Sequence, residues 1–451
     1  MLLGTQEVGP DGHLIVGGCD AVELARRFGT PLYVYDVEGI RAACRAYRSA
    51  FAEGWPAVEV AYACKAFSVG AMLQLVVEEG LGLDVVSEGE LRLALWSGIE
   101  PGCVTLHGSF KTAAEIELAL LCGVGRVVVD SLEEIGPLAA AARRVGRRQP
   151  VLVRLNAGVA VDTDPRYATG ANAKFGLAIR DGSARTAIEA VRAQDALLLE
   201  GLHFHLGSQL FDPAPYRTAI ERTAGLLAEL ERDRPLRPSR VVVGGGMAAR
   251  YRPEERPPAP GRWAEAICEA FARVLAPHCA DDVVLGIEPG RSIVAEHGLM
   301  LYTLGPIKAT GEDAHGLDAV VVVDGGLSDN PRPLMYAAHH EVLLAAAADE
   351  PARTTVAICG RHCEPDVLLP RVDLPAIRTG DVVAVQSTGA YTHAMASNYN
   401  RSMRPAVVFV ERGESRVVQR AQTWRDLVST DTAVPAAALR PRPSAAPSAT
   451  R

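Results

Sequence analysis

The sequence of 451 residues predicts an α/β fold: a (β/α)8 TIM-like barrel followed by a C-terminal β-sandwich or β-barrel domain that also includes the N-terminal strand segment. From Val58 onward, short β-branched runs alternate eight times with amphipathic segments that end at Gly or Pro, which is the pattern of a parallel barrel with outer helices. After Gly290, β-like runs follow one another without long helices, which predicts an all-β domain.

The eight expected barrel strands cover residues 58–65, 83–87, 104–109, 125–130, 151–156, 200–206, 240–244 and 283–288. Helical spacing of apolar residues follows several of them, in segments 69–79, 88–96, 113–121, 132–145 and 264–276. Because each strand is followed by a helix-like segment, neighbouring strands are expected to run parallel.

The two ends of the chain differ from this repeat. At the N-terminus, β-like runs 14–16 and 31–35 flank a helical segment 21–28 that ends at Gly29. At the other end, the β-like runs are 299–304, 319–323, 354–358, 381–385, 405–410 and 415–418. We therefore expect an N-terminal segment 1–36 packed on the β domain, a barrel 37–295, a β domain 296–432 and a disordered tail 433–451 rich in Ala, Pro, Ser and Arg.

Composition narrows the class of partner. The formal net charge is -8, and charges of both signs are interspersed, so no basic stripe for nucleic acid or a membrane surface is present in the sequence. No signal-peptide pattern opens the chain, and no apolar run approaches the roughly 20 residues of a membrane span. The 9 cysteines lack paired CxxC spacing, so neither disulfides nor a metal site is expected. A small-molecule partner and a cytoplasmic location are the expectations.

The first expected barrel strand ends at a lysine. Ala61, Ala63 and Lys65 share one face of segment 58–65, so the amine is flanked by small side chains. Lysine amines form Schiff bases with carbonyl cofactors such as pyridoxal phosphate, and a bulky covalent partner requires such cleared space. Taken alone, the stretch is explained more simply by a solvated lysine at a strand end. The residues at the ends of the other strands are therefore needed to choose between the two interpretations.

Polar groups stand at the ends of three later strands, where barrel active sites form. Strand alternation places His203 and His205 on one face, segment 244–246 is three consecutive glycines, and Glu288 is followed closely by Arg291. Glycines allow a backbone to approach an anion, and arginine offers a fork for phosphate. A glycine run alone is equally a flexible turn, and Glu288 alone equally a capping acid. Their convergence with Lys65 favours a pyridoxal phosphate site.

The same residues lie in a set of motifs that resembles the fold-type III pyridoxal-phosphate decarboxylases, most closely their diaminopimelate decarboxylases. The resemblance covers nearly all of residues 30–430. Its motifs are residues 62–66 (Tyr-Ala-Cys-Lys-Ala), 84–91, His107-Gly108 with Lys111, 174–176 (Lys-Phe-Gly), 203–209, 244–246, 288–294, 332–336, Cys363-Glu364, 389–391 and 397–400.

The resemblance implies a role for each site residue. Lys65 would attach pyridoxal 5'-phosphate through a Schiff base, His205 would stack on its ring, and Glu288 would keep the ring nitrogen protonated, which makes the ring a better electron sink. The remaining cofactor-binding residues implied are Asp84, Ser208, Gly245, Gly246, Gly290, Arg291 and Tyr391, most of them around the phosphate.

The reaction implied is decarboxylation of meso-2,6-diaminopimelate to L-lysine and CO2. Cys363, supplied by the partner subunit of a homodimer with shared active sites, would return a proton to the α-carbon. A small buried apolar residue is the alternative interpretation of this cysteine. Substrate binding would fall to Arg291, Arg332, Tyr336, Glu364 and Tyr391, with Glu364 facing the distal amine and Arg332 the distal carboxylate.

The sequence also departs from the family pattern. Segment 363–366 reads Cys-Glu-Pro-Asp, one residue shorter than the common Cys-Glu-Ser-Gly-Asp, Ala173 replaces a common serine, and His393 is unusual. Other functions therefore stay open. They are decarboxylation of ornithine, arginine, carboxynorspermidine or a carrier-bound amino acid, a pyridoxal-phosphate racemase, and a non-catalytic homologue.

Overall fold

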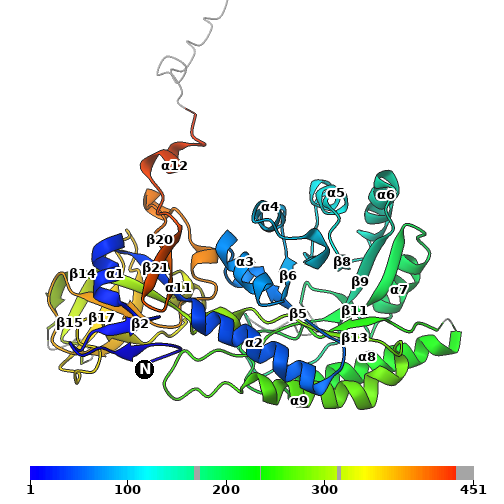
Figure 1. The fold of residues 1–451 in the computed structure, drawn as a ribbon, viewed down its shortest axis with the longest axis horizontal. Helices are drawn as coiled ribbons and strands as arrows, with labels where there is room; N and C mark the ends of the chain where they lie inside the picture. The colour runs from blue at the N-terminus through cyan, green and yellow to red at the C-terminus, as the bar shows by residue number, and fades with distance from the viewer. Residues whose placement is uncertain (167–172, 234, 312–315, 433–451) are drawn as a thin grey trace, which may run out of the picture.

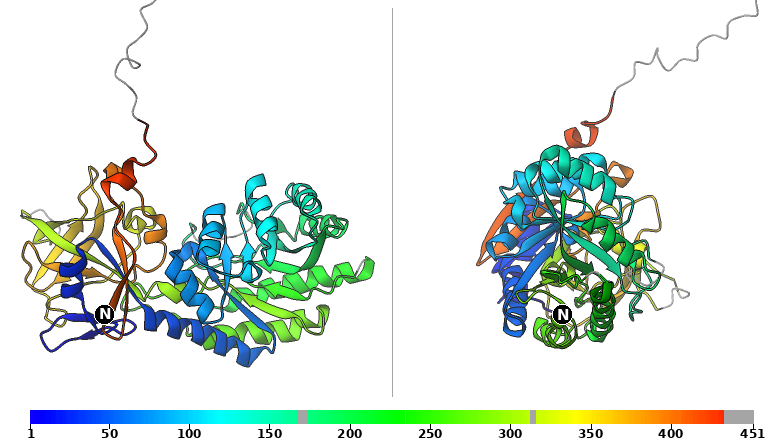
Figure 2. Two further views of the ribbon diagram at one scale, coloured as in Figure 1. Left: turned by 45° about the horizontal axis from the view of Figure 1, so that its top comes forward. Right: turned by 90° about the vertical axis from the view of Figure 1, so that its right-hand side faces the viewer.

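The computed structural model describes residues 1–166, 173–233, 235–311 and 316–432, so the tail predicted to be disordered lies outside the described residues. The described chain forms a barrel and a second sheet that lie side by side (Figure 1). The barrel and the second sheet are also distinct in a second view, where the N-terminus lies on the side of the second sheet (Figure 2).

The barrel closes as predicted. Each strand pairs in parallel with its neighbours, and pairing of β13 with β5 and of β8 with β9 completes the ring. Within the described chain its strands are β5 (Val58–Ala63), β6 (Gly82–Val85), β7 (Val104–Leu106), β8 (Arg126–Val129), β9 (Gln149–Asn156), β11 (Leu197–Phe204), β12 (Arg240–Val242) and β13 (Val284–Ile287). The two-residue strand β10 (Leu177–Ala178), which pairs with β9, was not predicted because it is too short for a periodic signal.

Helices lie outside the barrel strands (Figure 1). They are α2 (Val37–Gly54), α3 (Gly70–Glu78), α4 (Glu88–Trp96), α5 (Ala113–Cys122), α6 (Ile135–Val145), α7 (Ser183–Arg192), α8 (Ala214–Asp233) and α9 (Pro260–Ala270). Local sequence fixes their ends. Helix α5 begins with a capping box of Thr112 and Glu115 and ends at Gly123 in the left-handed region. Helix α6 begins later than the expected residue 132, because the Glu134 carboxylate binds the preceding backbone N–H groups, including that of Ser131 at 3.1 Å.

The expectation that the first barrel strand runs to Lys65 is wrong. Strand β5 ends at Ala63, and Cys64–Ala66 form a 3-10 turn. The ladder stops because the chain turns back on itself, and the Tyr62 hydroxyl donates to the Phe67 carbonyl oxygen over 2.9 Å. Lys65 is exposed on this turn, whereas Cys64 and Ala66 beside it are fully buried.

The second sheet contains a strand from the N-terminal segment, as predicted. Strand β4 (Leu32–Asp36) pairs antiparallel with β14 (Gly298–Ala309) and parallel with β20 (Ala406–Glu411). The other strands are β15 (Ala319–Val323), β16 (Val342–Leu344), β17 (Thr354–Cys359), β18 (Val367–Leu374), β19 (Val382–Val385) and β21 (Glu414–Gln419). Strands β16 and β18 were not predicted, since β16 is short and β18 carries Pro370 and charged residues.

The first residues form a small sheet of their own. It contains β1 (Glu7–Val8), β2 (Leu14–Val16) and β3 (Cys19–Asp20), and it leads into α1 (Ala21–Phe28). Asp20 caps α1 by accepting from the Val22 backbone N–H at 2.8 Å, and Gly29 follows the helix as expected.

A buried aromatic contact joins the barrel to the second sheet. Tyr35 of β4 stacks on Phe67, which follows the Lys65 turn, with 3.9 Å between ring centroids and 11° between planes. Both rings belong to the main hydrophobic core, which continues from the barrel into the second sheet. The lysine turn is therefore packed against the second sheet.

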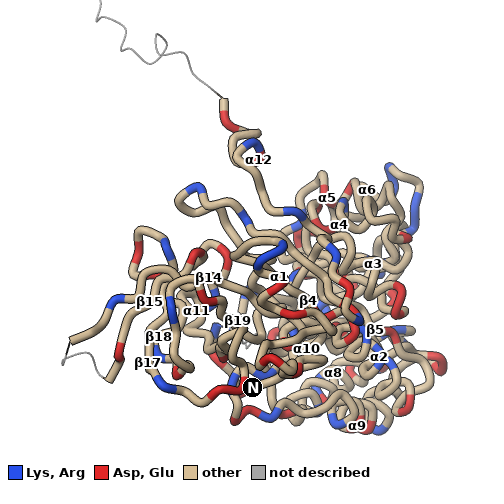
Figure 3. Tube along the Cα trace, turned by 60° about the vertical axis from the view of Figure 1, so that its left-hand side comes forward, with Lys and Arg blue, Asp and Glu red and all other residues tan. Residues whose placement is uncertain are grey.

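Charge is mixed over the surface. Lys and Arg segments alternate with Asp and Glu segments in the view of Figure 3. Among the described helices, none combines the length and the apolar character needed to span a membrane.

Candidate active site

A cavity of about 520 Å³ opens at the carboxyl ends of the barrel strands. Residues from different strands and from the second sheet converge on it, as barrel geometry requires. The predicted site residues that line it are Lys65, Asp84, His205, Ser208, Gly246, Glu288, Gly290, Arg291, Arg332, Tyr336 and Tyr391.

One side of the cavity is built where the second sheet meets the lysine turn. The backbone N–H of Tyr391 donates to the Ala66 carbonyl oxygen over 2.8 Å, and Tyr391 has a φ of 57°. Gly389 lets the same loop pack closely on α10 (Arg291–Val294), because a Cβ there would lie 1.8 Å from the Val294 carbonyl oxygen. Tyr391 therefore reaches the barrel cavity from the second sheet at a fixed position beside Lys65.

The same end of the cavity carries a buried cation. Arg291 begins the short helix α10 (Arg291–Val294), is 4% exposed, and donates from Nε to Ser208 Oγ at 3.1 Å and from Nη1 to Tyr251 Oη at 2.8 Å. Its guanidinium lies 4.8 Å from the Tyr391 ring centroid. Arginine, serine and tyrosine donors in one corner form a site suited to a phosphate.

Glycines allow the backbone segments in this corner to pack closely against one another. A Cβ on Gly245 would fall 1.9 Å from the Glu288 carbonyl oxygen, and Gly246, with a φ of 122°, would clash with the Gly207 carbonyl oxygen. The Gly245 backbone N–H donates to His205 Nδ1 at 3.3 Å, so the ring of His205 is held against the glycine loop. Burial lowers the pKa of His205 well below its usual value, which leaves a neutral imidazole on the cavity wall.

Deeper in the barrel, a carboxylate lies between two imidazoles. Glu288 Oε2 is 3.0 Å from His203 Nε2, and Glu288 Oε1 is 3.5 Å from His107 Nε2. His107 Nε2 also lies 3.4 Å from Asp84 Oδ1. Burial raises the pKa of Glu288, and burial together with the charge of Glu288 raises that of Asp84. Two buried carboxylates at one place would stabilise a cationic group of a ligand.

Another part of the cavity wall is formed by the short helix α11 (Arg332–Tyr336), which follows β15. Arg332 is 2% exposed, and its Nε and Nη1 have no hydrogen-bond partner in the described part of the chain. The Arg332 guanidinium lies 5.0 Å from the Tyr251 ring centroid. Arg166 of the barrel donates to the carbonyl oxygens of Met335 and Tyr336 at 2.7 and 2.8 Å, which ties α11 to the barrel.

Three predicted site residues, Gly245, Cys363 and Glu364, do not line this cavity. Cys363 is exposed, so its alternative interpretation as a buried apolar residue is wrong. Glu364 accepts from Tyr399 Oη at 2.6 Å and lines a second hollow of about 570 Å³ with Pro333 and Leu334. Helix α11 thus directs Arg332 into the main cavity and Leu334 into the hollow beside Glu364.

Several cavity residues were given no role from the sequence. His107, Lys174 and Phe175 belong to motifs shared with the decarboxylase family, and all three line the cavity. The motifs alone do not predict which groups these side chains contact. Arg154 had a clear signal, since it is a single charge within the apolar strand β9. Tyr251, which bonds Arg291 but does not itself line the cavity, had no such signal, because a tyrosine in the loop after β12 is commonplace.

The residues present fit pyridoxal phosphate. The orphaned carboxylate oxygen Asp84 Oδ2 and the buried Glu288 suit the cationic ring, and Arg291 with the glycine loop suits the phosphate. Lys65 supplies an amine in the same cavity.

Comparison with known proteins agrees with this geometry. Residues 37–295 match the family model for the pyridoxal binding domain of pyridoxal-dependent decarboxylases. The chain therefore belongs to the pyridoxal-dependent decarboxylases, and the predicted enzyme class and cofactor are confirmed.

Several similar proteins are diaminopimelate decarboxylases. The diaminopimelate decarboxylase of Bacillus subtilis is 41% identical over 433 residues, covering 95% of this chain and 98% of the relative. That of Actinosynnema pretiosum is 42% identical and covers 92% of each chain. The crystal structure of the M. jannaschii diaminopimelate decarboxylase has a TM-score of 0.88 at 32% identity, covering 96% of this chain and 98% of that one.

Proposed function

We propose that this chain catalyses the decarboxylation of meso-diaminopimelate to L-lysine and CO2. The observation that carries the choice of substrate is Arg332, a buried guanidinium that faces the main cavity with Nε and Nη1 unpartnered in the described chain. A buried cation with two unpaired N–H donors is costly, so the site favours a ligand that brings a carboxylate to Arg332. Diaminopimelate carries a second carboxylate distant from the reacting carbon, whereas ornithine does not.

Different residues of the chain would bind the cofactor and support the decarboxylation. When bound, pyridoxal phosphate supplies the electron sink that accepts the electron pair left by the departing carboxylate. Lys65 would attach the cofactor through its amine, and Arg291, Ser208 and Gly246 would hold the phosphate. His205, a neutral imidazole, would pack against the cofactor ring, and Glu288 would stabilise the proton on the ring nitrogen.

We further propose that the active unit is a homodimer in which each cavity is completed by the partner subunit. The support is that Cys363 is exposed and lies outside the cavity of its own chain, although the reaction requires a proton donor at the α-carbon. Large apolar side chains near this loop are also exposed, including Leu334 at 46% and Met403 at 52%. In this proposal Cys363 donates the proton and Glu364 binds the distal amine of the substrate in the neighbouring cavity.

Reduced cysteines agree with a cytoplasmic location, which we propose on that ground. Cys363 must be a free thiol to donate a proton, and the thiols of the described chain are unpaired.

The first experiment measures CO2 release by the cofactor-loaded protein with meso-diaminopimelate, ornithine, arginine and lysine supplied separately. Release from diaminopimelate alone, with L-lysine as product and none from Lys65→Ala, is the expected result. The variant Arg332→Met should raise the KM for diaminopimelate at least 10-fold, since a charge-assisted hydrogen bond is lost. Equal rates with ornithine would reject the substrate assignment.

A second experiment tests the shared site. Lys65→Ala and Cys363→Ala are each expected to be nearly inactive, but mixing and reassembling equal amounts should restore about one quarter of wild-type activity. Random pairing makes about half of the dimers mixed, and each mixed dimer has one intact site. A mixture as inactive as its components would show that Lys65 and Cys363 act from the same chain.

A further inference from the structure

The buried carboxylate Glu288 has a hydrogen-bond partner, His203, on strand β11. His203 Nε2 lies 3.0 Å from Glu288 Oε2, within hydrogen-bond range, whereas His107 Nε2 is more distant at 3.5 Å from Oε1. His203 stands on β11 two residues before His205 and is 1% exposed. It therefore lines the cavity as a buried side chain and contacts the carboxylate of Glu288 there.

The protonation of His203 follows from its surroundings. Burial lowers the pKa of His203 well below its usual value, and the charges of His107, Arg154 and Lys65 act in the same direction. The carboxylates that face this cluster are Glu288 and Asp84. At neutral pH the imidazole is therefore neutral and carries one N–H.

The position of that proton is set by the contacts of the two ring nitrogens. His203 Nδ1 is buried and has no hydrogen-bond partner among the described residues, whereas Nε2 faces the carboxylate. A proton on Nδ1 would leave a buried N–H unpaired and would point the Nε2 lone pair at a carboxylate oxygen. The Nε2–H tautomer avoids both costs, so His203 donates to Glu288.

We propose that His203 is a positioning residue for Glu288: as a neutral donor it orients the carboxylate toward the ring nitrogen of the cofactor without neutralising it. A cationic side chain at this place would pair with Glu288 and weaken its pull on the ring nitrogen. A residue without a donor would leave a buried carboxylate free to rotate or take up a proton. The inference rests on the proposed role of Glu288, and it holds whichever amino acid is the substrate.

The test compares His203→Leu, which removes the donor, with His203→Gln, which keeps a neutral N–H donor, and uses Glu288→Gln as the reference. The measurements are the dissociation constant of pyridoxal phosphate, the pH titration of the bound cofactor's absorbance, and kcat and KM. We expect His203→Leu to raise the dissociation constant and lower kcat by about 10-fold each, the effect of losing one hydrogen bond to a charged group. KM should change by less than about 2-fold, and His203→Gln should stay within about 3-fold of wild type throughout.

These measurements distinguish a failure of the Glu288 role from a failure of the His203 role. If Glu288→Gln leaves cofactor affinity and absorbance unchanged, the role of Glu288 fails. If Glu288→Gln changes them and His203→Leu does not, the inference about His203 is overturned. Equal defects in His203→Gln and His203→Leu would also overturn it, because ring shape rather than donation would then matter.

A measurement on the unaltered holoenzyme covers the case in which a variant does not fold. Nitrogen-15 NMR of histidine-labelled protein should show His203 neutral with the proton on Nε2 across neutral pH. A doubly protonated ring, or a proton on Nδ1, would refute the proposal.

Discussion

The backbone N–H of Tyr391 donates to the carbonyl oxygen of Ala66 over 2.8 Å, which joins the second sheet to the turn that carries Lys65. Neither residue could be paired with the other from the sequence, since 325 positions separate them. The geometry of the lysine turn therefore depends on the packing of the barrel against the second sheet.

Gly389→Ala should disturb this docking. Its Cβ would lie 1.8 Å from the Val294 carbonyl oxygen, so the loop that carries Tyr391 must shift. We expect a loss of about 1–3 kcal/mol in the free energy of unfolding, as for other overpacked sites, and at least a 10-fold fall in kcat/KM. The control is Gly225→Ala in α8, where an added Cβ meets nothing within 4 Å and helix propensity favours alanine. Denaturant unfolding and steady-state kinetics measure both, and equal behaviour of the two variants would contradict the prediction.

Arg291→Lys should weaken cofactor binding even though it keeps the positive charge. Arg291 donates to Ser208 Oγ from two nitrogens, each at 3.1 Å, and to Tyr251 Oη from a third. A lysine ammonium cannot reproduce this planar fork. We expect the dissociation constant of pyridoxal phosphate to rise at least 10-fold, measured by absorbance titration. The exposed Arg273→Lys serves as the control, and an unchanged constant in Arg291→Lys would exclude a phosphate-binding role.

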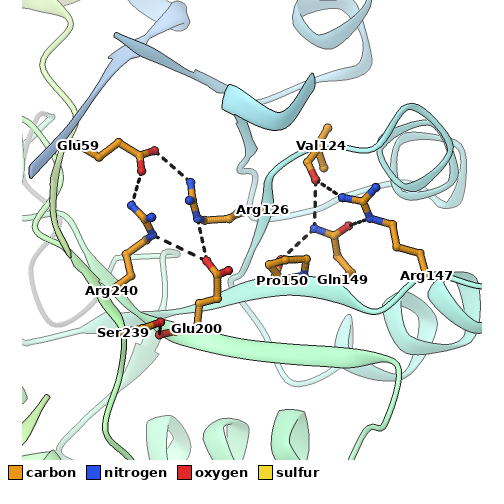
Figure 4. A network of polar contacts seen from close by, with 9 residues as sticks. All are labelled: Glu59, Val124, Arg126, Arg147, Gln149, Pro150, Glu200, Ser239 and Arg240. Carbon is orange, nitrogen blue, oxygen red and sulfur yellow. Dashed lines mark hydrogen bonds and ion pairs between the residues drawn. The ribbon is translucent and has the colours of Figure 1, made fainter. Parts of the chain in front are cut away.

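The amino ends of the barrel strands carry a network of four charges (Figure 4). Arg126 bonds Glu59 at 3.0 Å and Glu200 at 2.9 Å, and Arg240 bonds Glu59 as well. Arg126 and Arg240 are only 15% and 12% exposed, so removal of one partner leaves a poorly solvated charge.

Glu59→Gln should therefore lower stability with little change in catalysis, because the network lies at the amino ends of the barrel strands and Glu59 does not line the main cavity. After allowance for partial exposure, we expect a loss of about 1–3 kcal/mol in the free energy of unfolding and kcat within about 2-fold of wild type. The matched control is Glu269→Gln, which breaks an exposed pair with Arg273 and should cost less than about 0.5 kcal/mol. Equal losses in the two variants would mean that burial of the network is unimportant.

Asp329 should make stability depend on pH. It is buried, accepts from Tyr302 Oη at 2.6 Å, and burial raises its pKa to about 6. Because the folded pKa exceeds the unfolded value, its contribution to stability is fully present below the unfolded pKa and is lost as pH rises through about 6.

Asp329→Asn removes this titration. Between about pH 7.5 and about pH 4.5, wild type should gain roughly 2 kcal/mol in unfolding free energy relative to the variant. Thermal and denaturant unfolding at the two pH values provide the comparison. A difference between the proteins that is constant with pH would show that Asp329 does not titrate as proposed.

Much of the barrel and of its site was predictable because both follow from local patterns. Period-two apolar runs located each barrel strand, and the rule that active sites form at carboxyl strand ends selected Lys65, His205, Glu288 and Arg291, which line one cavity. Errors occurred where a tertiary contact overrides periodicity. Strand β5 stops at Ala63 because the following turn is bonded to Tyr62 and docked on the second sheet.

The sequence by itself determined the fold class, the chemical types of the site residues and the cofactor, because strand periodicity and short motifs are encoded by neighbouring residues. Only the tertiary structure decided the contacts between distant segments: Tyr391 with Ala66, His203 with Glu288, Tyr251 with Arg291, and Arg332 within the main cavity while Cys363 lies outside it. Such contacts form only when the barrel closes and the second sheet packs against it, which brings together side chains that are far apart in the chain. No local sequence pattern specifies these spatial relationships.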